Sequence, residues 1–186
     1  MTTVLNININ DLSNQFIQEL KNKFNKTTQI EIRIDTGEQQ SELLSENQFW
    51  QILALLDWPQ EKYSAILAPA IEALSKMPVA NIYLFKDKLS EKLYLLDTKA
   101  HTSAYKSKDP DHFLSADDFL YTRCAVVAEG QSYYENVLKN PDAMPFDMAF
   151  EPLLSLADDA YTMKTGKKFN YFPTFNYETG SNKESR

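Results

Sequence analysis

Residues 115–130 read SADDFLYTRCAVVAEG, and this stretch decides the fold. Ser115 and Asp118 have the spacing of a capping box at the start of a helix, and Gly130 is typical of a helix end. Between them, apolar residues lie on nearly every side of the expected helix. Because a helix that is apolar all round is buried, we expect this one to form the centre of a domain.

Helical spacing continues on both sides of this stretch. The expected helices cover residues 46–58, 61–76, about 80–105, 132–139 and 151–166. Ser45 and Gln48 form a second capping box before the first of these helices. Pro69 predicts a kink or a restart in the next one. Helix is thus expected for roughly 60% of the chain, well above the usual third.

The N-terminal residues have a different pattern. Residues 4–10 and 29–34 alternate apolar and polar side chains, as strands with one buried face do, and helical spacing lies between them. This order predicts a βαβ module with parallel strands. An uncovered strand edge binds other strands. The side chains assigned to this interaction edge are Ile7, Ile9, Ile32 and Ile34.

An aromatic tail follows the last expected helix. Its rings are Phe169, Tyr171, Phe172, Phe175 and Tyr177. In an extended chain the odd-numbered positions from 171 to 177 share one face, so we expect the tail to dock. It either adds an edge strand to the N-terminal module or packs across the helical domain, and Pro173 limits the first arrangement to an edge.

These patterns together predict an α+β protein that is mainly α. We expect a βαβ module at residues 1–36, a multi-helix domain with the docked aromatic tail at 42–180, and a frayed end at 181–186. The polar stretch TGEQQS, residues 36–41, joins the module to the helical domain.

The scarce residue types exclude several classes of site. The four glycines are too far apart for a dinucleotide fingerprint or a phosphate-binding loop. One cysteine allows no internal disulfide and no multi-cysteine zinc site, and two histidines cannot form a three-histidine site. We therefore expect no cofactor and no metal, and no set of catalytic residues emerges, which favours a protein that is not an enzyme.

Charge and hydropathy bear on partners and location. With 19 basic and 26 acidic residues, the net charge is −7, which is unsuited to a nucleic-acid backbone and suited to a basic protein partner. The first twenty residues contain no basic side chain and no apolar block, so we expect no secretory signal and no membrane span. A lone thiol then favours the cytoplasm.

Arg123 is the most unusual residue of the central helix. An arginine among apolar side chains keeps its charge and needs acceptors. The candidate carboxylates are Asp97, Glu91, Asp118 and Glu151. Asp97 is favoured because its helix carries the main apolar stripe. Arg123 either belongs to a buried ion pair that sets helix register or binds an anion at the floor of a pocket.

A candidate ligand site surrounds this arginine. On one continuous helix, Asp97 and His101 would share a face and reach one water or metal. The predicted site consists of Asp97, His101, Arg123 and Tyr121. Asp109, Asp111 and His112 follow in a loop, where aspartates are more typical of turns and caps than of a metal site. Cys124, without an adjacent base, is expected to be a core thiol.

Short motifs along the helical part match a known family. They are Phe49-Trp50, Leu74-Ser75-Lys76-Met77-Pro78, Leu96-Asp97, Asp118-Phe119-Leu120-Tyr121-Thr122-Arg123, Asn140-Pro141-Asp142 and Lys164-Thr165-Gly166. Over residues 47–166 the chain resembles the bacterial domain-of-unknown-function family 4240. The resemblance implies a mostly helical bacterial domain, brings no catalytic residues, and leaves the βαβ module outside.

The preferred function is a non-catalytic interaction or regulatory role in the bacterial cytoplasm, such as an antitoxin- or immunity-like one. We expect the chain to bind a protein partner, or a second copy as a dimer, through the N-terminal sheet, unless the tail covers that edge. The alternative is a small-ligand-binding protein or hydrolase-type enzyme with a pocket around Asp97, His101 and Arg123.

Overall fold

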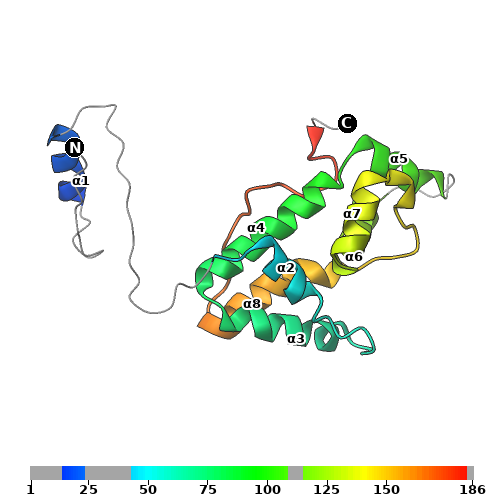
Figure 1. Cartoon of the computed structure of the whole chain (residues 1–186), viewed down its shortest axis with the longest axis horizontal. Coiled ribbons are helices and arrows are strands. Elements are labelled where there is room, and N and C mark those ends of the chain that lie inside the picture. The colour runs from blue at the N-terminus through cyan, green and yellow to red at the C-terminus, as the bar shows by residue number, and fades with distance from the viewer. Residues whose placement is uncertain (1–13, 24–42, 109–114, 184–186) are drawn as a thin grey trace. The chain divides into compact units, whose positions relative to one another are not determined.

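The computed structural model describes residues 14–23, 43–108 and 115–183 (Figure 1). The chain divides into two compact units, Met1–Gln40 and Ser41–Arg186. In the first unit the described part is helix α1 (Asn14–Lys23). All other elements belong to the second unit.

The α+β class predicted from the sequence is wrong, because the described residues form helices and contain no strand. The helix expected between the two strands is confirmed as α1. Residues 4–10 and 29–34, predicted as the strands, lie outside the described residues. The same holds for the proposed edge residues Ile7, Ile9, Ile32 and Ile34. Alternation over six or seven residues is a short signal, and two strands alone are marginal.

The prediction of a partner bound through an N-terminal sheet is wrong for the same reason as the fold class. No sheet exists in the part of the chain that the structure describes, so this part has no strand edge for a second copy or another protein to extend. Within the described residues, the surfaces open to a partner lie on the helices and on the segments that join them.

The described part of the second unit is built from α-helices and 3-10 turns. They are α2 (Glu46–Leu53), α3 (Tyr63–Lys76), α4 (Val79–Leu95), α5 (Lys99–Ser107), α6 (Ala116–Ala128), α7 (Gln131–Lys139), η2 (Pro141–Ala143), η3 (Glu151–Ser155) and α8 (Leu156–Thr165). Helix α8 packs on α3 and α4, and α5 and α7 both contact η2. Figure 1 shows α3 and α8 side by side.

Helix α6 is the buried centre, as its sequence predicts. Nine of its 13 residues are buried, and the helix packs on α4, α7 and η3. Ser115 Oγ accepts a hydrogen bond from the backbone N–H of Asp118 at 3.4 Å. Gly130 follows the helix with a φ of 95°, a conformation that side chains with a Cβ rarely adopt. Both predicted ends of the helix are thus confirmed.

The long helix predicted over residues 80–105 is interrupted. The structure has α4, a break at residues 96–98, and then α5. Thr98 is the N-cap of α5, and its Oγ1 accepts a hydrogen bond from His101 N at 3.2 Å. A threonine at this position stabilises a new helix start. Asp97 therefore lies in the break and does not share a helix face with His101.

The two preceding helices differ from prediction mainly at their ends. The capping box before α2 is confirmed, with Gln48 N donating to Ser45 Oγ at 3.1 Å and Ser45 N donating to Gln48 Oε1 at 2.8 Å. However, α2 ends at Leu53 instead of Trp58. Helix α3 continues through Pro69 without a restart.

The aromatic tail docks on α4 and not on a sheet, which confirms the second of its two predicted positions. Tyr171 Oη donates to one Asp87 carboxylate oxygen at 2.7 Å, and Thr174 N donates to the other at 2.8 Å. The ring of Phe175 lies 5.3 Å from that of Tyr94. Figure 1 shows the tail passing along α4 toward the start of α5.

Candidate functional site

Arg123 is completely buried in α6, and its charge is stabilised by groups from other segments. Nη1 donates to the carbonyl of Leu93 at 2.8 Å, and Nη2 donates to Thr179 Oγ1 at 2.9 Å. The guanidinium carbon also lies 5.0 Å from the centre of the Phe119 ring. Since the arginine cannot lose its proton, these contacts hold a permanent positive charge in the core.

Asp97, in the break between α4 and α5, is also completely buried. Its Oδ2 accepts hydrogen bonds from the backbone N–H groups of Gly180 at 2.9 Å and Asn182 at 3.1 Å. Ser181 Oγ donates to the same oxygen at 3.4 Å. The φ of Gly180 is 94°, which allows the tail to turn its amides toward the carboxylate. Several donors on one carboxylate stabilise its charged form.

The two buried charges bind the same short segment, residues 179–182, which we call the C-terminal clasp. Two more hydrogen bonds hold its ends: Thr179 Oγ1 donates to the Ala116 carbonyl at 2.6 Å, and Asn182 Nδ2 donates to the Tyr94 carbonyl at 3.1 Å. Asn182, which the sequence placed in a frayed end, is buried. The clasp therefore fills the neighbourhood where the sequence predicted a ligand.

His101 is buried on α5, and both ring nitrogens have protein partners. Nε2 lies 3.0 Å from the Val137 carbonyl oxygen, and Nδ1 lies 2.7 Å from Thr98 Oγ1. A carbonyl only accepts, so Nε2 carries the proton and Nδ1 accepts from the threonine hydroxyl. Burial lowers the pKa of His101 despite the opposing effect of the Val137 bond, and Arg123 lowers it further. The ring is thus a neutral core histidine.

Tyr121, the fourth predicted ligand residue, is half-buried and lies where α6 meets η3. Its backbone carbonyl accepts a hydrogen bond from Phe150 N at 3.0 Å. Burial raises the pKa of its phenol, and the carboxylate of Glu151 raises it further.

The buried thiol of Cys124 has its pKa raised by burial to about 12, so it is an inert core group, as predicted.

A pocket opens at a different place from the predicted one, between α5, the first turns of α6 and the segment before η3. Its volume is about 320 Å³. The lining residues are Tyr105, Asp118, Thr122, Phe146, Asp147, Met148 and Ala149. The four residues of the predicted ligand site are not among them. Residues 144–150 show no regular periodicity, and the sequence offered no signal for this pocket.

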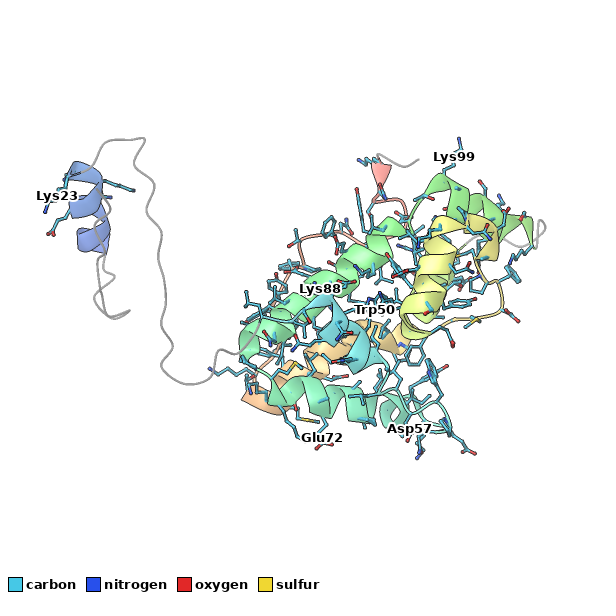
Figure 2. The ribbon with its side chains drawn as sticks, viewed as in Figure 1. Lys23, Trp50, Asp57, Glu72, Lys88 and Lys99 are labelled. Carbon is cyan, nitrogen blue, oxygen red and sulfur yellow. The ribbon has the colours of Figure 1, made fainter. Side chains whose placement is uncertain are left out.

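A second surface feature is an aromatic patch formed by Trp58 and Tyr63 around the ring of Phe150. Phe150 is buried, whereas Trp58 is 44% exposed and Tyr63 is 58% exposed. Their rings lie 5.0 Å and 5.9 Å from the Phe150 ring. Asp57, labelled in Figure 2, marks the loop between α2 and α3 that carries Trp58.

The comparison with protein families matches a region that includes the pocket and the aromatic patch but not the clasp. The sequence pattern of the family "Protein of unknown function (DUF4240)" matches residues 44–163. The chain belongs to this family. No curated protein and no solved structure matches it.

The DUF4240 match includes both the aromatic patch and the pocket. It also includes Asp97 and Arg123, but it ends before the clasp that binds them. The family region therefore carries two buried charges that, in this chain, are bonded by a segment beyond that region. Motifs on α6 correctly identified the DUF4240 family from sequence.

Two further observations concern metal ligands and membrane spans in the described residues of this DUF4240 chain. Within residues 14–23, 43–108 and 115–183, no three His, Cys, Asp or Glu side chains are grouped as metal ligands would be. Asp109, Asp111 and His112 lie outside the described residues. No described helix combines the length and apolar character needed to cross a membrane.

Proposed function

We propose that the DUF4240 domain of this chain is a non-catalytic protein-binding module and that the aromatic patch is its contact surface. The observation that carries this proposal is the exposure of Trp58 and Tyr63 around the buried ring of Phe150. Single exposed apolar side chains are ordinary. Tryptophan and tyrosine packed together on a supporting ring, however, are typical of the residues that contribute most to protein binding.

Acidic side chains outnumber basic ones beside the patch and favour a basic partner. Asp57 precedes Trp58, Glu61 and Lys62 lie between the two exposed aromatics, and Glu151 follows Phe150. Together with the net charge of −7, they suit a partner with an apolar centre and a basic rim. An antitoxin- or immunity-like role in the cytoplasm, in which an acidic protein covers a basic one, is the form of this function that the charge favours.

The buried residues support a binding role over the enzyme alternative. Asp97 and Arg123 bind the clasp, and both ring nitrogens of His101 bind the protein itself. A catalytic acid or base has to reach its substrate, and these groups are enclosed by the chain. Ligand binding by Asp97, His101, Arg123 and Tyr121 stays a prediction, and the contacts of these residues favour the protein-binding proposal.

Co-purification from the host tests the proposal. We expect the tagged full chain to retain a basic protein in stoichiometric amount at moderate salt. The double variant Trp58→Ala, Tyr63→Ala should retain about tenfold less of this partner, or still less. Phe172→Ala is the matched control because this aromatic side chain is 94% exposed on the tail and makes no ring contact with the three patch rings.

Either of two results would overturn the proposal. One is the absence of any stoichiometric protein partner at low or moderate salt. The other is equal retention of the partner by the double variant, provided that circular dichroism and thermal unfolding show the variant to be folded.

A further inference from the structure

Two hydroxyl groups open into the pocket between α5, α6 and residues 146–149. Tyr105 and Thr122 both line it, although their side chains are almost completely buried. Neither hydroxyl has a hydrogen-bond partner among the residues that the structure describes. Neither hydroxyl oxygen is among the fully buried atoms that lack a partner, so each is accessible from the pocket. These two hydroxyls therefore favour a ligand with a polar group that reaches into the pocket.

The rest of the lining indicates the charge of that ligand. Asp118 and Asp147 contribute two carboxylates, and no lysine, arginine or histidine occurs among the lining residues. The rings of Tyr105 and Phe146, whose centres lie 5.2 Å apart, form an aromatic wall. Aromatic faces and carboxylates both attract organic cations. An anionic ligand would find no cationic side chain among these lining residues.

The size of the pocket limits the ligand further. A volume of about 320 Å³ lies at the lower end of the range for small-molecule sites, roughly 300–1,000 Å³. Met148 and Ala149 add apolar surface for a short carbon chain. We propose that this pocket binds an organic ammonium or guanidinium group on a short apolar stem, with Asp147 and Asp118 beside the charge and the two hydroxyls accepting its N–H groups.

Such a group has two sources, a free amine or the lysine or arginine side chain of a protein. The pocket adjoins the aromatic patch through the chain itself, because Ala149 lines the pocket and the next residue, Phe150, supports the patch. A bound protein segment would reach both. The binding of an organic cation stands on the pocket alone and does not depend on the protein-binding proposal.

The test is a titration of the ¹⁵N-labelled full chain with n-butylammonium chloride at constant ionic strength, followed by amide chemical shifts. We expect saturable shifts at Thr122 and Ala149. n-Butanol, which lacks the charge, and sodium butyrate, which reverses it, should cause no saturable shift at these residues. Asp147→Asn should raise the Kd of n-butylammonium about tenfold, or roughly 1.4 kcal/mol.

Matched variants separate binding from folding. Asp142→Asn removes an exposed aspartate on η2 that is not among the lining residues, and the Kd should be unchanged. Thr122→Val keeps the shape of the side chain but removes the hydroxyl, so it should weaken binding, whereas Thr122→Ser should retain it. The absence of saturable shifts, or the same Kd in Asp147→Asn as in the wild type, would overturn the proposal.

A second titration identifies the source. The probes are the capped tripeptides Gly-Lys-Gly and Gly-norleucine-Gly. If the lysine peptide binds about tenfold more tightly than n-butylammonium, the pocket binds a side chain of a partner. If the free amine binds as well as the peptide, the ligand is a small amine. Equal binding of the norleucine peptide would contradict the proposal, because that peptide carries no charge.

Discussion

Arg123 keeps a positive charge in the core because acceptors from two other segments reach it. The Leu93 carbonyl lies on α4, and the Thr179 hydroxyl lies on the tail. Asp97 keeps a negative charge in the same way, with backbone amides of the tail as donors. Removing either charged residue leaves polar groups buried without their partners, which costs more than the lost contact itself.

The first prediction concerns Arg123 itself. We expect Arg123→Met to lower the free energy of unfolding by about 3 kcal/mol or more, because the Leu93 carbonyl and the Thr179 hydroxyl lose their charged donor. Urea unfolding followed by circular dichroism measures this change. Lys168→Met, at an exposed position, should change the stability by less than about 0.5 kcal/mol. Similar values for the two variants would show that the buried charge is not structural.

The second prediction concerns His101 and pH. Its folded pKa is lowered from the ordinary value of 6.5, chiefly by burial. The unfolded chain therefore binds more protons than the folded one just below pH 6.5, and the stability falls as the pH decreases through this window. The slope from one such group is at most about 1.4 kcal/mol per pH unit. Urea unfolding between pH 7.5 and 5.5 should show this loss.

His101→Gln is the matching variant, because glutamine does not titrate. Its stability should be lower at pH 7.5 but should depend less on pH than that of the wild type. The carboxylates whose pKa values are lowered, Glu46 and Glu72, titrate below their ordinary value of 4.5 and so outside this window. An unchanged pH dependence in His101→Gln would refute the assignment of a neutral, buried imidazole.

For the helices, the sequence predicted an end correctly where a capping residue adjoins a run of apolar residues. Ser115 and Gly130 correctly bounded α6, and Gly166 ends α8 with a φ of 68°. The break between α4 and α5 was missed because apolar spacing continues across it while Thr98 starts a new helix. Periodicity reports which side chains face the core, but it does not show whether the backbone between them is continuous.

In the tail, the sequence pattern predicted which side chains face the protein but not the hydrogen bonds that they make. From residue 171 to 179 the odd-numbered positions are half-buried and the even-numbered ones are exposed, as the pattern of aromatics predicted. Its binding to Asp97 and Arg123, however, joins residues more than fifty positions apart. Those contacts involve backbone amides and small polar side chains, which carry no hydropathy signal.

The third prediction concerns the clasp. Deleting residues 179–186 should lower the free energy of unfolding by about 3 kcal/mol or more, since both buried charges lose hydrogen bonds worth roughly 1.5–3 kcal/mol each. Thermal and urea unfolding measure the loss. Phe172→Ala in the same tail should leave the stability nearly unchanged because that side chain is 94% exposed. A truncated chain as stable as the intact one would mean that the clasp does not stabilise the buried charges.

For the whole molecule, the buried polar residues with the strongest sequence signal serve the fold, and the candidate contact surfaces lie elsewhere. His101 stands out in the sequence because histidine is scarce, and Arg123 stands out because its neighbours on the helix are apolar. Both side chains are hydrogen-bonded within the protein. The aromatic patch and the pocket come together only in three dimensions, around the segment 146–150. That segment has neither a repeat nor a motif, so no sequence pattern could indicate it.

Site-specific photo-crosslinking in the host tests the central claim most directly. With p-benzoylphenylalanine in place of Tyr63, we predict a crosslink to one basic protein in stoichiometric yield. The same photoreactive residue in place of Phe172, a more exposed aromatic on the tail, should give no crosslink to that protein. A crosslink of equal yield at both positions, or none at position 63, would contradict the assignment of the aromatic patch as the contact surface.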